Sequence, residues 1–209
     1  MEKIKIYVVG GDTNYAKWIH NAELVDKPEE ATIVLFTGGE DVDPSIYGKK
    51  KHTTTSSNID RDLEEKKIFD SMESWQLAVG VCRGSQLLCA LNGGILVQNC
   101  SGHARWDTHT ITDGNKFTEI TSTHHQMQYP WKIKSSDYDL LYWAAPSLSS
   151  YYDGDGVNEV PYEPEIVLYH VGGNPKSLAI QGHPEMMRED APVIEILNNL
   201  IQSCLTDDL

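Results

Sequence analysis

The sequence predicts an α/β fold in which a mostly parallel sheet is flanked by helices and extended by an antiparallel hairpin. Continuous apolar runs of strand length at residues 32–36 and 77–81 are typical of parallel strands, because both faces of such strands are buried. The second run passes through a glycine-containing turn into a helical pattern, which indicates a strand, a sharp turn and a helix in succession. β-Favouring segments at 108–112 and 117–121 flank the turn Asp113-Gly114-Asn115, which predicts the hairpin.

The composition indicates one globular domain over residues 1–209, since a chain of 209 residues with 40% hydrophobic residues can bury a sizeable core. The formal net charge of −14 opposes binding to nucleic acid, because affinity for phosphate depends on Lys and Arg. The N-terminal apolar run is too short for a signal peptide and no later stretch could span a membrane, so we expect a cytoplasmic protein without a membrane partner. The four cysteines lack the spacing of a disulfide framework or a zinc site, and we expect reduced thiols.

The first part of the chain reads as βα units. Residues 3–9 favour a strand, and Gly10-Gly11-Asp12 then leads into apolar residues at helical spacing (Tyr15, Trp18 and Ile19). The strand at 32–36 is followed by residues 38–44, which are rich in Gly, Asp and Pro. Because parallel sheets present functional loops at this edge, residues 38–44 are a candidate site loop.

The next segment returns the chain to the sheet. Residues 49–58 are polar and without periodicity, which is typical of a mobile surface loop. Asp60 is expected to cap a helix whose apolar stripe contains Leu63, Ile68 and Met72. That helix leads to the strand at 77–81, and after its elbow helix, residues 95–97 form another short buried strand.

The second half is expected to contain several strands and to close with a helix. The hairpin delivers a polar segment, 121–126, and further strands are predicted at 138–144, 166–171 and 177–181. Residues 151–164 form an irregular acidic loop. The final helix is capped by Asp190 and buries a stripe of apolar residues (Val193, Ile196, Leu197, Leu200, Ile201 and Cys204).

Cys82 stands between the strand at 77–81 and its helix, with Gly80 and Gly84 on either side. This pattern has the form of a nucleophile elbow with Cys in place of Ser, which would hold an exposed sulfur at a helix N-terminus. The positive end of the helix favours the thiolate, and the N–H of Arg83 is left to face an oxyanion. A lone cysteine is more often an inert core residue, so this interpretation requires a second signal.

A thiol nucleophile needs a base, and the base needs a group that orients it. His183-Pro184-Glu185 directly follows the strand at 177–181, in a second loop at a strand end. Two residues apart in an extended turn, Glu185 and His183 can face the same way, which gives the order Cys, His, Glu. Taken alone, His183 is more often a surface or packing residue.

These residues support a family resemblance. The segments Gly80-Val81-Cys82-Arg83-Gly84-Ser85-Gln86 and Gln181-Gly182-His183-Pro184-Glu185 together closely resemble the class I glutamine amidotransferase superfamily, which has a flavodoxin-like fold and a Cys-His-Glu triad. Residues 37–44 (TGGEDVDP) and 122–126 (STHHQ) resemble the γ-glutamyl-γ-aminobutyrate hydrolase branch. The resemblance extends from Lys3 to about Leu200, although the chain is shorter than that branch around residues 49–58 and before Trp131.

The resemblance implies a role for each matching residue. Cys82 would attack a γ-glutamyl carbonyl to form a thioester, His183 would shuttle the proton, and Glu185 would hold the imidazole. The N–H groups of Arg83 and of Gly39 or Gly38 would form the oxyanion hole. Contacts with the glutamyl group would come from Gln86, His124, His125 and Gln126. No cofactor is implied, and Asp60-Arg61-Asp62, which also resembles a family signature, receives no catalytic role.

Several functions remain open from the sequence. The first is a free-standing hydrolase of a small-molecule γ-glutamyl substrate, and the second is a glutaminase subunit that passes ammonia to a separate synthetase. A third is a binding or regulatory module that kept the fold without the activity. Metal binding by the histidines at 103, 109, 124 and 125 is a fourth possibility, but their spacing fits no zinc motif, and we expect no metal.

Overall fold

The computed structural model describes residues 3–206. Its main sheet has nine strands, with the first five strands in the sheet parallel and each of the last four antiparallel to its neighbours. In spatial order these are β2 (Ala22–Leu24), β1 (Ile4–Val8), β3 (Ile33–Phe36), β4 (Leu77–Val81), β13 (Ser177–Ile180), β12 (Pro164–Tyr169), β10 (Tyr138–Ala144), β7 (Ala104–Thr112) and β8 (Phe117–Thr123).

Two short ribbons and a few helices complete the chain. One ribbon pairs β5 (Ile95–Val97) with β9 (Met127–Tyr129), and the other pairs β6 (Asn99–Cys100) with β11 (Tyr152–Asp153). The α-helices are α1 (Ile59–Asp70), α2 (Arg83–Leu91) and α3 (Pro192–Thr206). Single 3₁₀ turns are η1 (Thr13–Ala16), η2 (Pro28–Glu30), η3 (Pro44–Tyr47), η4 (Pro130–Lys132) and η5 (Pro184–Met186).

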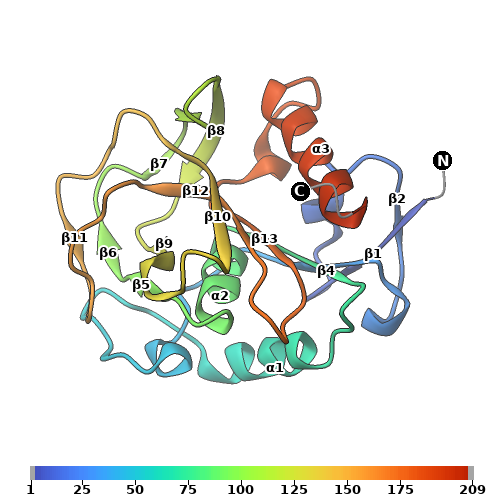
Figure 1. Cartoon of the computed structure of the whole chain (residues 1–209), viewed down its shortest axis with the longest axis horizontal. Helices are drawn as coiled ribbons and strands as arrows, with labels where there is room; N and C mark the ends of the chain where they lie inside the picture. Colours follow the sequence, from blue (N-terminus) through green and yellow to red (C-terminus); the bar gives the residue numbers. More distant parts are fainter. Residues whose placement is uncertain (1–2, 207–209) are drawn as a thin grey trace.

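The sheet lies between two layers of helix, with α3 on one face and α1 and α2 on the other (Figure 1). Alternate residues of the parallel strands supply the two cores, because successive side chains of a strand point to opposite faces. Val79 and Ile180 pack in the cluster that contains α3, whereas Ala78 and Ala179 pack in the cluster that contains α1 and α2. Burial on both faces explains why these strands read as continuous apolar runs.

The predicted α/β fold, with a parallel sheet flanked by helices, is confirmed. The antiparallel part is larger than the single predicted hairpin, because β10 and β12 join β7 and β8 to the parallel strands. The strand predicted at 138–144 matches β10 at both ends. The sequence of a strand does not show which other strand it pairs with, since pairing depends on contacts between residues far apart in the chain.

The helix predicted after Gly11 is wrong, since only the 3₁₀ turn η1 forms there. Asn198 of α3 forms hydrogen bonds with backbone groups in this segment, which a longer helix would have paired with one another. Its amide accepts a hydrogen bond from His20 N (2.8 Å) and donates one to Trp18 O (2.9 Å). Trp18 and Ile19 are still buried, each 4% exposed, so their apolar spacing reflects core packing rather than a helix.

Helix α1 also differs from its prediction. Asn58, not Asp60, caps it by accepting a hydrogen bond from Arg61 N (3.3 Å). Its buried residues are Asp62, Glu65 and Phe69, while Leu63 is 44% exposed. The two carboxylates face inward because they pair with a buried arginine, described below.

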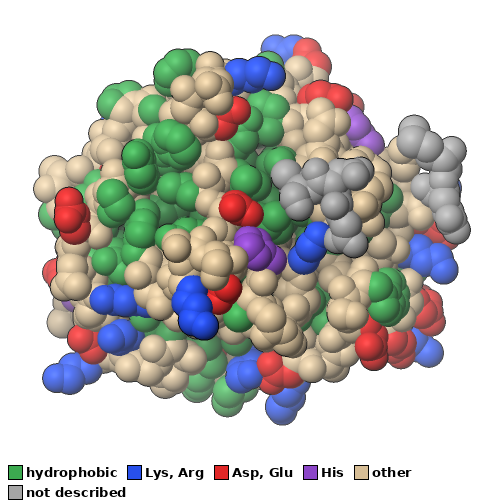
Figure 2. All heavy atoms as spheres, in the orientation of Figure 1, with side chains coloured by type: hydrophobic (Ala, Val, Ile, Leu, Met, Phe, Trp, Pro, Cys, Tyr) green, Lys and Arg blue, Asp and Glu red, His purple; other side chains and the backbone are tan. Residues whose placement is uncertain are grey.

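Three further features concern the helices, the cysteines and the surface. No helix within residues 3–206 is both long enough and apolar enough to cross a membrane. The four cysteines are buried, and no disulfide joins any of them in the described part of the chain. On the face shown in Figure 2, hydrophobic side chains gather over the region of β6, β11 and β12.

Candidate active site

The turn between β4 and α2 holds Cys82 in a strained backbone conformation, with φ 51° and ψ −108°. This conformation is rare for a residue with a side chain and is typical of functional turns. The neighbouring glycines are required by close approach of the backbone. A Cβ on Gly80 would lie 2.6 Å from the carbonyl of Gly84, and a Cβ on Gly84 would overlap the carbonyl oxygen of Phe36. The local sequence therefore fixes the elbow.

Sheet register brings His183 to this elbow. Ile180 of β13 lies opposite Val81 of β4, so the two strands end at the same level of the sheet. Cys82 N donates a hydrogen bond to Ile180 O (2.8 Å). The Nδ1–H of His183 donates to Glu185 Oε1 (2.6 Å), and Thr121 Oγ1 donates to His183 O (2.7 Å). The other ring nitrogen, Nε2, is buried and is the nitrogen left to interact with the Cys82 side chain.

The electrostatics of this group favour a charged imidazole. Burial alone would lower the pKa of His183, but hydrogen bonding and charge from Cys82, together with those from Glu185, raise the pKa to about 10. A protonated imidazole held between a cysteine sulfur and a carboxylate has the order of a nucleophile, a base and an orienting group. The arrangement can attack a carbonyl carbon and deliver a proton to a leaving group.

Cys82 is less accessible than predicted. The elbow pattern predicts an exposed sulfur, but the residue is only 7% exposed. Tyr15 of η1 lies over the site, with its ring centroid 6.4 Å from that of His183. Burial, followed by the charges of Glu185 and Cys82, raises the pKa of Tyr15 to about 12. The thiol is thus buried, and Tyr15 lies against its histidine partner.

The loop after β3 lies against the same group. A Cβ on Gly38 would be 2.6 Å from Tyr15 Oη and 3.3 Å from His183 Cε1. Gly39 has φ +144°, and a Cβ there would overlap the guanidinium of Arg61. Arg61 holds the loop by donating to Gly38 O (3.0 Å) and to Thr37 Oγ1 (3.3 Å). The two glycines therefore allow both the arginine and the active-site residues to approach the backbone.

Arg83 begins α2 and carries a guanidinium that is buried beneath the elbow, at 1% exposure. It pairs with Asp62 and Glu65 of α1, and Glu65 also accepts a hydrogen bond from Arg61 Nε (2.8 Å). Because Arg83 lies in the first turn of α2, its backbone N–H has no carbonyl four residues earlier in the helix to bind. Arg61 therefore holds the loop with Gly38, and Asp62 holds the side chain of Arg83, so both candidate oxyanion donors are fixed by residues of α1.

The residues predicted to bind substrate occupy the next layer. Gln86 donates through Nε2 to Gln126 O (2.9 Å), and Gln126 donates to Thr55 Oγ1 (3.1 Å). His125 Nε2 lies 3.0 Å from Asp41 Oδ1, and this hydrogen bond raises the pKa of His125. His124 instead points into a buried cluster with His103 and Glu165. These contacts order the 124–126 segment, and a role in substrate binding stays a prediction.

The chain is similar in sequence to a known protein family. The family model described as peptidase C26 matches residues 21–135, more than half of the chain, including the Cys82 elbow. The chain belongs to the peptidase C26 family. This family lies within the class I glutamine amidotransferase superfamily, as the motifs predicted.

Relatives of this peptidase C26 member agree with that placement. A Mycobacterium tuberculosis protein, provisionally named glutamine amidotransferase Rv2859c, is 26% identical over 179 residues, which cover 78% of this chain and 54% of that protein. The chain therefore spans about half the length of this curated relative. An identity of 26% agrees with membership of the same superfamily. The activity in the relative's name is that of the relative.

Solved structures support the fold. A Thermoplasma acidophilum protein, provisionally described as a GMP synthase component, superposes with a TM-score of 0.61 at 18% identity and covers 100% of this chain and 97% of its own. A Thermotoga maritima glutamine amidotransferase gives a TM-score of 0.53 at 12% identity, covering 99% and 98%. At these identities the likeness concerns the fold alone.

A hollow of about 570 Å³ borders the other side of the His183–Glu185 turn in this peptidase C26 member. Its lining includes Thr121, Phe117 and Met186, and does not include Cys82 or His183. Phe117 and Met186 are 71% and 48% exposed. The hollow therefore lies beside the candidate active site, and the thiol does not line it.

Sequence reasoning misses several residues around the site. Tyr15 has the spacing of a helix residue, and Arg61 and Asp62 receive no role from the signature that contains them. Glu163 and Glu165 stand next to an apolar strand pattern in the sequence, and both are buried in the structure. Acidic residues beside a buried strand are the sequence signal that could have marked them, because buried acidic residues need partners. Their histidine partners come from other elements, and no local pattern identifies them.

Proposed function

We propose that this chain is a cysteine-dependent hydrolase that cleaves a γ-glutamyl amide bond and belongs near the γ-glutamyl-γ-aminobutyrate hydrolase branch. The observation that carries the proposal is Cys82 in a strained elbow beside the hydrogen-bonded pair of His183 and Glu185. Membership of the peptidase C26 family supports hydrolytic chemistry of this type.

The proposed reaction has two steps. The Cys82 thiolate attacks the γ-carbonyl carbon, the C–N bond breaks, and His183 gives its proton to the departing amine, which leaves a γ-glutamyl thioester. Water then attacks the thioester carbonyl while His183 takes up a proton, and the C–S bond breaks to release glutamate and the thiolate. Glu185 keeps the proton-carrying Nδ1 of His183 oriented throughout.

Charge on the carbonyl oxygen would be stabilised by backbone N–H groups. The proposed donors are Arg83 at the start of α2 and Gly39 or Gly38 in the loop held by Arg61. Removal of one such donor typically costs on the order of 3 kcal/mol of transition-state stabilisation. Gln86 and the 124–126 segment would contact the glutamyl end, with Gln126 Oε1 buried and lacking a hydrogen bond to any described residue.

The test combines turnover with covalent labelling. The purified protein should release glutamate from glutamine or from members of a panel of γ-glutamyl amides, and Cys82→Ala should abolish release. A diazoketone analogue of glutamine should label Cys82 rather than the other cysteines, and His183→Ala should slow the labelling. Cys89→Ala is the matched control, because Cys89 is also buried yet lies in the core. An equal labelling rate in the wild type and His183→Ala, or equal labelling of all four cysteines, would show that the triad is not assembled.

A second candidate is a glutaminase subunit that passes ammonia to a separate synthetase. One finding favours it: the hollow beside the His183–Glu185 turn has the exposed side chains of Phe117 and Met186 in its lining, where a partner could bind. A free-standing hydrolase turns over its substrate alone. Labelling of Cys82 without steady turnover of any γ-glutamyl amide would favour the glutaminase role.

A further inference from the structure

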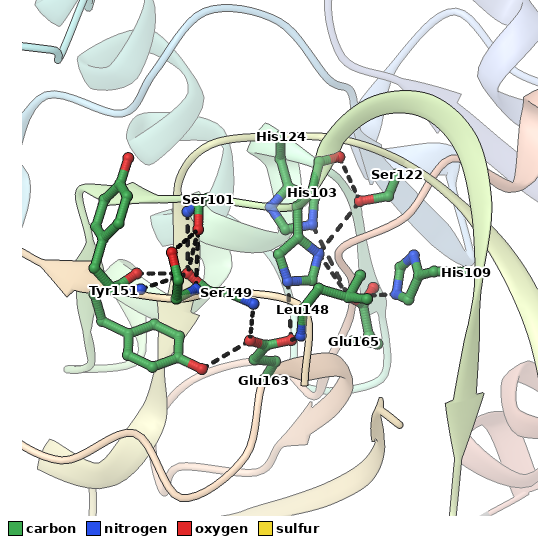
Figure 3. Close-up of polar contacts among 12 residues, drawn as sticks. Ser101, His103, His109, Ser122, His124, Leu148, Ser149, Tyr151, Glu163 and Glu165 are labelled. Atoms are coloured by element: carbon green, nitrogen blue, oxygen red, sulfur yellow. Dashed lines mark hydrogen bonds and ion pairs between the residues drawn. The ribbon is translucent and has the colours of Figure 1, made fainter. Parts of the chain in front are cut away.

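We propose that His103, His124 and Glu165 form a binding site for a divalent metal ion of the zinc class, independent of the thiol chemistry proposed above. His103 immediately precedes β7, His124 follows β8, and Glu165 lies on β12. Figure 3 shows the two rings side by side with Glu165 next to them. One ligand atom from each residue lies within 4.8 Å of the others, and all three residues are buried.

The outer nitrogens of both rings are already engaged. His103 Nε2–H donates to Glu163 Oε2 (3.1 Å), and His124 Nδ1–H donates to Gln126 O (2.8 Å). Glu163 also accepts hydrogen bonds from Leu148 N and Ser149 N, each at 2.7 Å (Figure 3). A further hydrogen bond comes from Tyr152 Oη (2.7 Å), so both carboxylate oxygens of Glu163 accept from donors. Metal-binding histidines characteristically donate their second ring N–H to a carboxylate or a backbone carbonyl.

This arrangement leaves lone pairs that face a carboxylate. His103 Nδ1 lies 3.6 Å and His124 Nε2 lies 3.9 Å from Glu165 Oε1. His124 Nε2 and Glu165 Oε2 are buried without a hydrogen bond to any of residues 3–206. Acceptor atoms that converge in a buried place repel one another unless a cation lies between them.

Neighbouring side chains do not remove this repulsion. Ser122 Oγ lies 3.3 Å from His103 Nδ1, but its single hydrogen goes to His103 O (2.7 Å). His109 Nε2–H donates to Glu165 Oε1 (2.9 Å), which orients the carboxylate and leaves Oε2 available. The rival explanation is that a proton rather than a metal ion lies between these groups, and the experiment below separates the two.

Two imidazole nitrogens and one carboxylate oxygen suit Zn²⁺ and leave one position for water. Ligand atoms around four-coordinate zinc lie about 3.3 Å apart. The three donor atoms lie within 4.8 Å of one another, so ring rotations that bring them closer by up to about 1.5 Å would complete the site. A bound ion would tie the β7–β8 hairpin to β12. It would also fix the segment whose Gln126 carbonyl binds Gln86 (2.9 Å), next to the elbow helix.

The test measures metal binding by the full chain after removal of metal with a chelator. Titration calorimetry with Zn²⁺ should give one ion per chain, and Co²⁺ should produce visible d–d bands of a low-coordinate nitrogen and oxygen site. Glu165→Gln should weaken binding by at least about 100-fold, because it removes an anionic ligand. His170→Gln is the matched control, since His170 pairs with Asp139 (3.1 Å) at the surface, and it should bind like the wild type.

Cys82→Ala separates this site from the active-site thiol. It should retain the full affinity and the same Co²⁺ spectrum, with no near-ultraviolet thiolate-to-cobalt band in either protein. The proposal is wrong if the wild type fails to bind one ion, if Cys82→Ala loses binding, or if His170→Gln loses as much as Glu165→Gln. Absence of binding would mean that a proton, and not a metal ion, lies between these groups. If circular dichroism shows that Glu165→Gln does not fold, the Co²⁺ spectra of the wild type and Cys82→Ala still test whether a nitrogen and oxygen site binds the ion.

Discussion

The buried ion cluster beneath the elbow yields a prediction of stability. Glu65, at 3% exposure, accepts hydrogen bonds from Arg83 and from Arg61 Nε. Glu65→Gln keeps the shape of the side chain and removes its charge. The two guanidinium groups of the cluster then have one carboxylate, that of Asp62, in place of two. Breaking a buried ion pair in this way typically costs about 3–5 kcal/mol, because a charge stays buried without compensation.

The expected change is large enough to measure by thermal and urea unfolding. A domain of this size loses roughly 2–4 °C in Tm per kcal/mol, so Glu65→Gln should lower Tm by about 6–20 °C. Asp70→Asn is the matched control on the same helix, because it breaks the exposed pair with Lys66 (2.6 Å), a pair of a type worth at most about 1 kcal/mol. Equal losses for the two variants would refute the reasoning that the Arg83 cluster is buried and required.

Three further predictions concern the site and the core. Since the pKa of His183 is raised to about 10 from an ordinary value of 6.5, its protonated ring should stabilise the folded state fully below pH 6.5 and lose this effect as the pH rises through 10. Unfolding of His183→Gln and the wild type across this range should therefore converge, and a constant difference would contradict the assignment. Gly84→Ala should cost about 1–3 kcal/mol or more and abolish glutamate release because of the overlap with Phe36, whereas Gly172→Ala, where a Cβ meets nothing within 4 Å, should be tolerated. Cys89→Ala should lower the free energy of unfolding by about 1 kcal/mol in urea titrations and leave glutamate release unchanged; a larger loss would mean that its bond to Ile95 O (3.4 Å) matters more than its volume.

The parts of the molecule that can be predicted from sequence depend on local patterns. The elbow at Cys82 requires a strand, two glycines and a helix within a few residues, and each leaves a direct mark in the sequence. The His183–Glu185 pair is also local, and both follow a strand whose apolar run is unmistakable. Their convergence then follows from the parallel pairing of β4 and β13.

The remainder depends on contacts between distant segments. Asp62 and Glu65 look like a solvated helix face, because charged residues are rarely buried, and only the distant Arg83 reverses that interpretation. The spacing of His103 and His124 resembles no metal motif, since their third partner, Glu165, comes from another strand. Trp18 reads as a helix residue because a buried loop anchored by a side-chain amide has the same apolar content.

The turn before β13 has a practical consequence for engineering this protein. It lies at the end of β13 opposite His183, about 13 Å of strand away. A Cβ on Gly172 or Gly173 would meet nothing within 4 Å, while Asn174 anchors the chain to Asn92 (3.0 Å). A reporter peptide inserted between Gly172 and Gly173 should therefore leave the catalytic register intact, whereas one added residue within β13 would rotate the chain and turn His183 away from Cys82.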